Sequence, residues 1–288
     1  TRTSCDPPEW EPLSLLEEAT STWSRRQPGT RIGSVSNRIY AGPVTPAITT
    51  RGLEVRFGDT VALSDLDLTV APGSSLAVIG PNGSGKSTLL GALAGSIRST
   101  SGHASVAGSA PALVLQSTDV DRSLPITVRD TVSLARYPTL GLFGRFRDAD
   151  RAAVDRALAR LRIDALAGRQ LHELSGGQRQ RVMVAQGLAQ DTGVLLLDEP
   201  VTGLDVVSRA IILEVTDEEV AAGRTVVVTT HNLDDARRCD QVLLLDNSPI
   251  AIGPPDEVLT ERHLRRAFGG RFIRIGDELL LDDPHHSH

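Results

Sequence analysis

The amino-acid sequence predicts an α/β fold built on a mainly parallel β-sheet, and two observations support this prediction. First, short apolar runs recur along the chain, and helical patterns lie between several of them. Strands that alternate with helices are typical of crossover units, whose strands run parallel and are buried on both faces. Second, one apolar run leads into a glycine-rich segment, residues 80–87, and then into a helical stretch. That order places the glycine-rich segment at the carboxyl edge of the sheet, where ligands of α/β folds bind.

The predicted elements begin at residue 53. Residues 53–57 and 61–70 surround a Gly58-Asp59 turn and are predicted as antiparallel strands, which form an N-terminal β subdomain. Further expected strands are buried, and they lie at residues 76–79, 112–115, 194–197, 226–229 and 242–245. Expected helices lie at residues 86–94, 150–161, 176–190, 208–222 and 233–239. Residues from about 117 to 190 contain helical patterns and no convincing strand, so they predict a helical insertion in the core.

Composition divides the chain into three parts. Residues 1–48 are rich in proline, serine, threonine and glycine, which predicts a disordered extension. Residues 49–262 form the predicted domain, and residues 263–288 form a tail that ends in a histidine-rich segment. Apolar runs stop far short of the roughly 18 residues needed to cross a bilayer, and no signal-peptide core opens the sequence. We therefore expect a cytoplasmic location.

Charge and cysteine content exclude several classes of protein. The net charge is −6, which provides no broad basic surface for duplex nucleic acid. Two cysteines, Cys5 and Cys239, exclude a disulfide framework. Lys86 is the single lysine among 30 basic residues, and it lies in the glycine-rich segment.

The glycine-rich segment matches the pattern G-x-x-x-x-G-K-[ST] in full. Its glycines allow successive N–H groups to turn toward one anion, while the following helix adds positive potential. Lys86 is expected to reach the outer phosphates of ATP, and the Ser87 hydroxyl is expected to bind Mg²⁺. The predicted nucleotide-binding residues of this loop are Gly80, Pro81, Asn82, Gly83, Ser84, Gly85, Lys86, Ser87 and Thr88.

Two acidic residues follow a second buried strand. Asp198 and Glu199 stand at the carboxyl end of residues 194–197, beside the expected nucleotide crevice. Asp198 is predicted to hold Mg²⁺ through water. Glu199, one residue later, is predicted to orient and deprotonate the attacking water.

One further motif resembles the signature sequence of the ATP-binding cassette (ABC) family: Leu174-Ser175-Gly176-Gly177-Gln178. The resemblance covers about residues 50–260, and it implies a P-loop NTPase fold with a RecA-like core. It also implies an ATP-dependent homodimer in which each signature closes over ATP on the partner's phosphate loop. Four more positions are assigned by this resemblance: Gln116 to Mg²⁺ sensing in the Q-loop, Asp205 to the D-loop, His231 to the catalytic switch and Phe57 to adenine stacking.

Two further features resemble one branch of this family. A single cassette without a membrane span is similar to a separately encoded importer subunit. Pro125 to Arg147 resembles the cassettes of the zinc and manganese branch, which implies a peripheral position on the cytoplasmic face of the cell membrane. The implied partners are transmembrane permease subunits and, indirectly, an extracytoplasmic metal-binding protein.

Zinc is the expected cargo, as in Azt-type importers, with import of manganese or iron-siderophore as the alternative. The C-terminal segment supports zinc, because it places three histidines beside Asp282 and Asp283. The same segment is also typical of a mobile polar terminus. A soluble ABC ATPase of nucleic-acid or ribosome maintenance is the alternative of another class. We expect no nucleic-acid partner, because acidic residues interleave with the arginines of residues 145–164.

Overall fold

The computed structural model describes residues 45–116, 125–140, 144–269, 272–275 and 278–281. Most of the predicted extension, residues 1–44, lies outside the described residues, and so does the histidine-rich segment 282–288. Within the described ranges, none of the helices combines the length and apolar character needed to cross a membrane.

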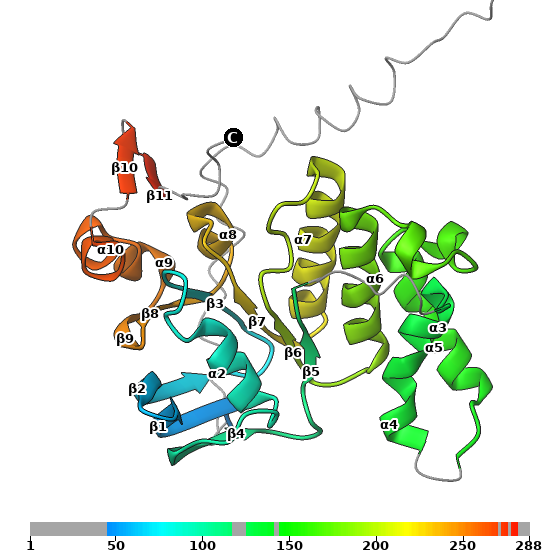
Figure 1. Cartoon of the computed structure of the whole chain (residues 1–288), viewed down its shortest axis with the longest axis horizontal. Helices are drawn as coiled ribbons and strands as arrows, with labels where there is room; N and C mark the ends of the chain where they lie inside the picture. Colours follow the sequence, from blue (N-terminus) through cyan, green and yellow to red (C-terminus); the bar gives the residue numbers. More distant parts are fainter. Residues whose placement is uncertain (1–44, 117–124, 141–143, 270–271, 276–277, 282–288) are drawn as a thin grey trace, which may run out of the picture. The chain divides into compact units, whose positions relative to one another are not determined.

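A six-stranded sheet forms the centre of the fold, as predicted (Figure 1). Its strand order is β5-β6-β7-β3-β8-β9, and every neighbouring pair is parallel except β8 with β9. Five of these strands match expected ones to within a residue at each end: β3 (Ser75–Ile79), β5 (Ala112–Val114), β6 (Val194–Leu197), β7 (Thr225–Thr229) and β8 (Gln241–Asp246). The sixth, β9 (Ser248–Gly253), was not expected.

The N-terminal antiparallel sheet has the order β2-β1-β4. Its strands are β1 (Ile48–Phe57), β2 (Thr60–Val70) and β4 (Ser101–Val106). β1 starts five residues before the expected residue 53, because Gly52 at φ 50° interrupts the alternation and shifts the register between Thr50 and Leu53. β4 was not predicted, since its sequence is polar and mostly exposed.

The inserted region contains only helices among its described residues. They are α3 (Val128–Ser133), α4 (Tyr137–Leu140), α5 (Asp148–Arg160) and α6 (Gly176–Ala189), with short 3₁₀ turns between them. α6 contacts α3, α5 and, in the core, α7 (Val206–Ala221). The fold class expected from the sequence is confirmed: an α/β core with an antiparallel subdomain and a helical insertion.

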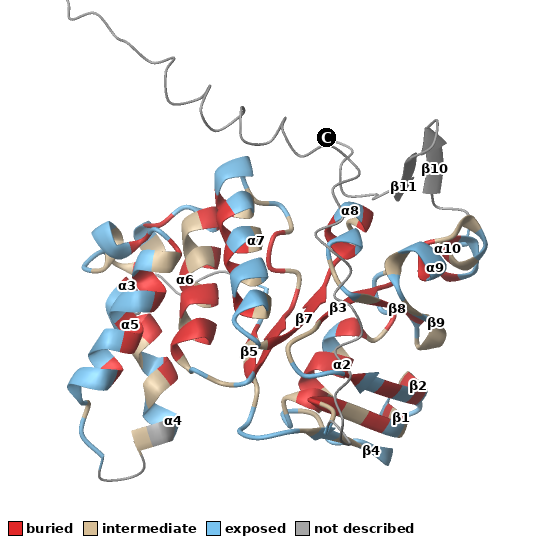
Figure 2. Ribbon diagram, turned by 180° about the vertical axis from the view of Figure 1, so that it is seen from behind, coloured by how far each residue is buried: buried red, intermediate tan, exposed pale blue. Residues whose placement is uncertain are grey.

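Two hydrophobic clusters lie on opposite faces of the central sheet. In β3, Ala77 and Ile79 join the cluster that contains α6 and α7, whereas Leu76 and Val78 join the cluster that contains α2 (Lys86–Leu93) and the antiparallel sheet. Figure 2 shows the buried residues concentrated along these strands and on the inner sides of the helices. This two-sided burial explains why the strands are continuous apolar runs.

The predicted domain boundary at residue 262 is wrong. Helix α10 (Glu261–Phe268) crosses it, and its Leu264 and Ala267 are buried in the core. This helix was not predicted, because only one stripe of an otherwise charged segment is apolar. Four further helices and strands complete the described chain: α8 (Leu233–Arg237), α9 (Pro255–Val258), β10 (Phe272–Ile275) and β11 (Glu278–Leu281).

Candidate active site

The predicted phosphate loop joins β3 to α2, the position that the motif requires. Close packing explains two of its glycines. A side chain at Gly80 would place its Cβ 2.0 Å from the carbonyl oxygen of Leu245, and one at Gly85 would place it 2.4 Å from that of Ala62. Gly85 also has φ 95°, a left-handed conformation at the N-cap of α2. The loop is therefore packed between β2 and the end of β8.

The side chain of Lys86 is only 6% exposed and folds back onto its own loop. Its Nζ donates to the carbonyl oxygens of Gly80, at 2.8 Å, and Pro81, at 3.1 Å. Nζ also lies 4.0 Å from Oε1 of Glu199. Burial lowers the pKa of Lys86 below its ordinary value, while Glu199 and Asp198 oppose that shift. Ser87 and Asn82 are exposed at the surface of the loop.

Asp198 and Glu199 follow the carboxyl end of β6, and their side chains lie in different environments. Asp198 is buried, and its Oδ1 accepts a hydrogen bond of 2.6 Å from the hydroxyl of Thr229 in β7. Glu199 is partly exposed and has φ 45°, a left-handed conformation that is unusual outside glycine. Neighbouring parallel strands thus bring a carboxylate pair beside Lys86.

His231 follows β7 and faces the same carboxylate. Its Nδ1 lies 3.9 Å from Oε2 of Glu199, which is longer than a hydrogen bond, and its side chain is 36% exposed. The structure therefore brings together three of the predicted catalytic residues: Lys86, Glu199 and His231. Gln116 is exposed two residues after β5, the edge strand that pairs with β6. Phe57 ends β1 and is 55% exposed.

The signature residues form the start of α6. Ser175 caps this helix, since its Oγ accepts from the N–H of Gln178 at 3.2 Å and the Gln178 side chain accepts from the Ser175 N–H at 3.1 Å. Leu174 is buried just before the cap. Gly177 faces the D-loop, because a Cβ there would lie 2.4 Å from Oδ2 of Asp205. Gly176, in contrast, borders open space.

Asp205 has a structural role that the sequence did not indicate. Its Oδ1 accepts from the backbone N–H of Ser208 at 2.8 Å, so it caps α7. Hydrogen bonds from Ser208 hold the pKa of Asp205 below its ordinary value. The structure thus joins the predicted D-loop to the predicted signature within one chain.

Thr229 is the polar residue of this site that sequence reasoning missed. It is fully buried, and it links Asp198 to Glu199 by donating to the first carboxylate and accepting from the N–H of Glu199 at 2.8 Å. Its only signal in the sequence is a threonine at the end of an apolar strand, which is common in sheets.

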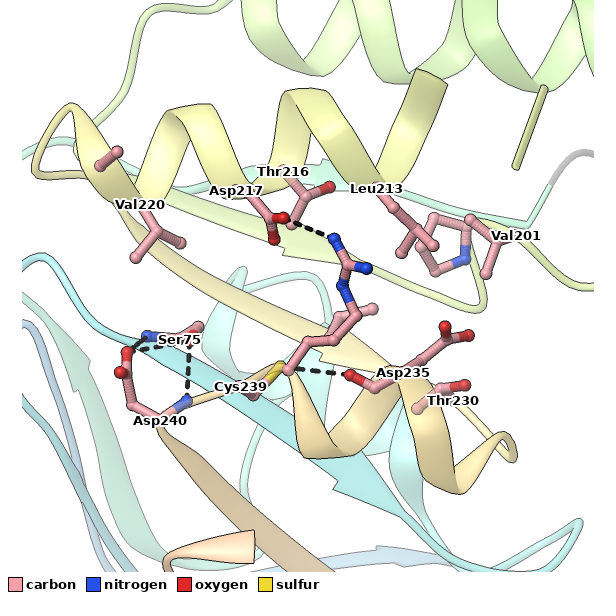
Figure 3. Close-up of a pocket in the computed structure, with 14 residues that line it drawn as sticks. Ser75, Val201, Leu213, Thr216, Asp217, Val220, Thr230, Asp235, Cys239 and Asp240 are labelled. Atoms are coloured by element: carbon pink, nitrogen blue, oxygen red, sulfur yellow. Dashed lines mark hydrogen bonds and ion pairs between the residues drawn. The ribbon is translucent and has the colours of Figure 1, made fainter. Parts of the chain in front are cut away.

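A separate cavity of about 260 Å³ lies between β7, α7 and α8 (Leu233–Arg237). Figure 3 shows its lining, which includes Val201, Leu213, Val220 and Asp217, and Asp217 forms an ion pair with Arg238. Its lining includes no residue of the phosphate loop, although Pro200 directly follows Glu199 and Thr230 directly precedes His231.

Known proteins resemble this chain in sequence and in fold. A family model for the ABC transporter matches residues 63–202. The manganese transport ATP-binding protein MntB of Listeria innocua is 36% identical, over 76% of this chain and 95% of its own. The chelated iron transport protein YfeB of Yersinia pestis is 35% identical, over 77% of this chain and 79% of its own. A solved inward-facing structure of a metal-chelate type ABC transporter has a TM-score of 0.72 at 28% identity, covering 82% and 96% of the two chains.

Proposed function

This chain belongs to the ABC transporter family as an ATP-binding cassette, and from that premise we propose that it drives import of a metal ion or metal chelate through a separate permease. As a cassette of this family it is a transport-coupled ATPase. The relative from Listeria innocua is the ATP-binding component of a transport system, which supports the expected permease partner. A location at the cytoplasmic face of the membrane follows from that partnership.

The position of Glu199 between Lys86 and His231 is the observation that best supports hydrolysis at this site. In our proposal the phosphates of ATP bind the loop of residues 80–88, and Lys86 exchanges its carbonyl contacts for phosphate oxygens. Glu199 acts as general base on the attacking water, and His231 orients that arrangement from the other side. Phe57, exposed at the end of β1, supplies a face for the adenine ring.

The residues beside the phosphate loop also fit a magnesium ion. Asp198 and Ser87 carry oxygen ligands, which Mg²⁺ prefers, and Gln116, two residues after β5, carries a third. No group of three or more His, Cys, Asp or Glu side chains that could hold a metal ion occurs among the described residues. When bound, Mg²⁺ would offset negative charge on the phosphates.

We propose that two copies of the chain form the complete site. Ser175 and the N–H groups of Gly176 and Gly177 at the start of α6 would cover the ATP held by the partner's phosphate loop. Val206 and Val207, directly after Asp205, are 83% and 65% exposed, so an apolar surface is available beside the D-loop. The second copy would cover that surface.

The cargo we propose is a transition-metal ion or its chelate. Manganese has the strongest support, because the match to the manganese transport protein MntB covers 95% of that relative's length. Zinc, expected from the sequence, stays a prediction. The histidine-rich segment that favoured zinc lies outside the described residues.

Two substitutions test the ATPase site. Glu199→Gln keeps size and removes basicity, so we expect ATP to bind while hydrolysis falls by roughly 10² to 10⁴. Glu214→Gln makes the same chemical change on an exposed part of α7 and serves as control. Lys86→Ala should abolish ATP binding. Native turnover in Glu199→Gln would contradict its role as general base.

Growth in chelated medium tests the cargo. A strain that lacks this chain should recover with one added metal only, and restoring the gene should remove that requirement. A gene carrying Lys86→Ala is the control, because it should express without restoring uptake. Recovery with manganese would support the first choice, and recovery with zinc alone would replace it. If no metal restores growth, the proposed cargo class is wrong.

A further inference from the structure

We propose that Asn247 is a positioning residue for ATP, because it holds the phosphate loop in its binding shape from outside the site. Asn247 forms the turn between β8 and β9, more than 150 residues after the loop in sequence. Its side-chain Nδ2 lies 3.2 Å from the carbonyl oxygen of Gly83 and 3.1 Å from that of Ala62. One side-chain amide thus joins the loop to β2.

The backbone of Asn247 makes two further hydrogen bonds, one to the phosphate loop and one to β2. Its N–H donates to the carbonyl oxygen of Ser84 at 2.9 Å, and its carbonyl oxygen accepts from the N–H of Ser64 at 2.7 Å. The residue has φ 53°, a left-handed conformation that asparagine tolerates better than most residues. Asparagine therefore satisfies both needs at this position: the turn conformation and the side-chain N–H donors.

These bonds add to a hydrogen bond within the loop itself, which the Ser84 N–H donates to the carbonyl oxygen of Pro81 at 3.1 Å. Gly83 has φ 82°, and glycine imposes little preference on the peptide that follows it. The Ser84 carbonyl and the Gly85 N–H belong to one trans peptide, so they point in opposite directions. Because Asn247 binds the Ser84 carbonyl, the Gly85 N–H points away from the turn, toward the side from which a phosphate can approach.

The packing around the loop supports this assignment. The carbonyl oxygen of Leu245, two residues before Asn247, lies so close to Gly80 that no side chain fits there. On the other side Ala62 does the same at Gly85. The end of β8 and β2 therefore pack against two parts of the phosphate loop. Asn247 forms hydrogen bonds to both the loop and β2.

This inference rests on the proposed phosphate role of residues 80–88, and it predicts a particular kinetic change. The hydrogen bonds of Asn247 go to the phosphate loop and to β2, and not to the carboxylates or His231, so its loss should weaken nucleotide binding more than the chemical step. In Asn247→Gly the left-handed backbone is retained and only the side-chain donors are lost. In Asn247→Asp the donors are replaced by acceptors that face three carbonyl oxygens.

The experiment measures the KM for ATP, kcat, the Kd for ADP by calorimetry, and Tm without nucleotide. We expect Asn247→Gly to raise KM and Kd about 5- to 20-fold, the scale of one or two lost hydrogen bonds, with kcat within about twofold. Asn247→Asp should raise them further. Asp65→Gly is the matched control, since Asp65 is an exposed residue of β2 that also has positive φ.

The outcomes separate this inference from the proposed function. Unchanged KM and Kd in both Asn247 variants would overturn the inference, and so would a fall in kcat alone. If Asn247→Gly does not fold, Asn247→Asp carries the same test. ATP binding by Lys86→Ala would instead show that the phosphate site itself is misassigned. If Lys86→Ala loses ATP binding while both Asn247 variants keep the parent's KM and Kd, the phosphate site is supported and only the proposed role of Asn247 is wrong.

Discussion

The N–H of Glu199 donates a hydrogen bond of 2.8 Å to the Thr229 hydroxyl. That hydroxyl donates in turn to Asp198 at 2.6 Å. A single buried side chain on β7 therefore holds two groups in position by hydrogen bonds: the carboxylate proposed to bind the metal and the backbone N–H of the proposed general base.

Removal of this hydroxyl should impair turnover. Thr229→Val keeps the branched shape but leaves the buried Asp198 and the Glu199 N–H without their partner, and an unsatisfied buried group costs about 1–3 kcal/mol. We expect kcat to fall about tenfold or more, while Thr229→Ser retains at least half of it. Steady-state ATPase assays over a range of Mg²⁺ concentrations check this. Equal kcat in Thr229→Val and the parent would rule out the linking role.

The two signature glycines should respond differently to a methyl group. In Gly177→Ala the new Cβ meets Asp205 and Ser208 of the same chain, so we expect a lower Tm, on the scale of about 1–3 kcal/mol for overpacking. In Gly176→Ala the space is open, so Tm should be unchanged. Thermal unfolding of each chain without nucleotide makes the comparison.

If the site is shared between two chains, Gly176→Ala should still lose ATPase activity. Mixing Gly176→Ala with Lys86→Ala should then restore part of it, because one intact signature meets one intact phosphate loop. The activity of the mixture is compared with that of each variant alone. Full activity of Gly176→Ala by itself would contradict a site completed by the second copy.

Asp150 should make stability depend on pH. Its carboxylate accepts from the Arg147 N–H at 2.9 Å and from Arg136 Nε at 3.0 Å, and these bonds hold its pKa below the ordinary 3.8. Stability from a lowered pKa is present above 3.8 and is lost as pH falls through the folded-state value. Asp150→Asn should therefore be less stable than the parent at neutral pH. Urea unfolding at several pH values should show the difference shrinking below about pH 4.

Cys239 should react slowly with thiol reagents. Burial is the main cause that raises the pKa of its thiol to about 12, although a hydrogen bond with Ser75 opposes the shift. Little thiolate is then present at about pH 8.5, where an ordinary cysteine is half ionised. In a Cys5→Ser variant, labelling by a disulfide reagent should be slow in the native protein and fast in guanidinium. Rapid native labelling would contradict this.

Prediction from the sequence succeeded where a local pattern carries the information. The apolar runs at residues 76–79 and 194–197 matched β3 and β6, and the motif around Lys86 identified the loop between β3 and α2. Local pattern failed for polar β4 and for amphipathic α10, whose apolar residues are too few to stand out. These elements are held by the sheet and core that they pack against.

The supporting residues of the site could not be predicted for a different reason. Thr229 lies 31 residues from the carboxylate that it contacts, and Asn247 lies 164 from Gly83. Such pairs form only when the strand order brings the ends of β6 and β7, or β8 and the loop, side by side. A single threonine or asparagine carries no local mark of that contact.

The left-handed backbone of Glu199 sets a trade-off between folding and activity. A non-glycine residue at φ 45° raises the energy of the native state by about 1–2 kcal/mol relative to a relaxed conformation. Replacing Glu199 by glycine would release that strain at the same time as it removes the proposed base. That change would also remove the carboxylate 4.0 Å from the buried Lys86. The backbone and the side chain therefore make opposite demands at this position, since glycine suits the turn and only the glutamate can act as base.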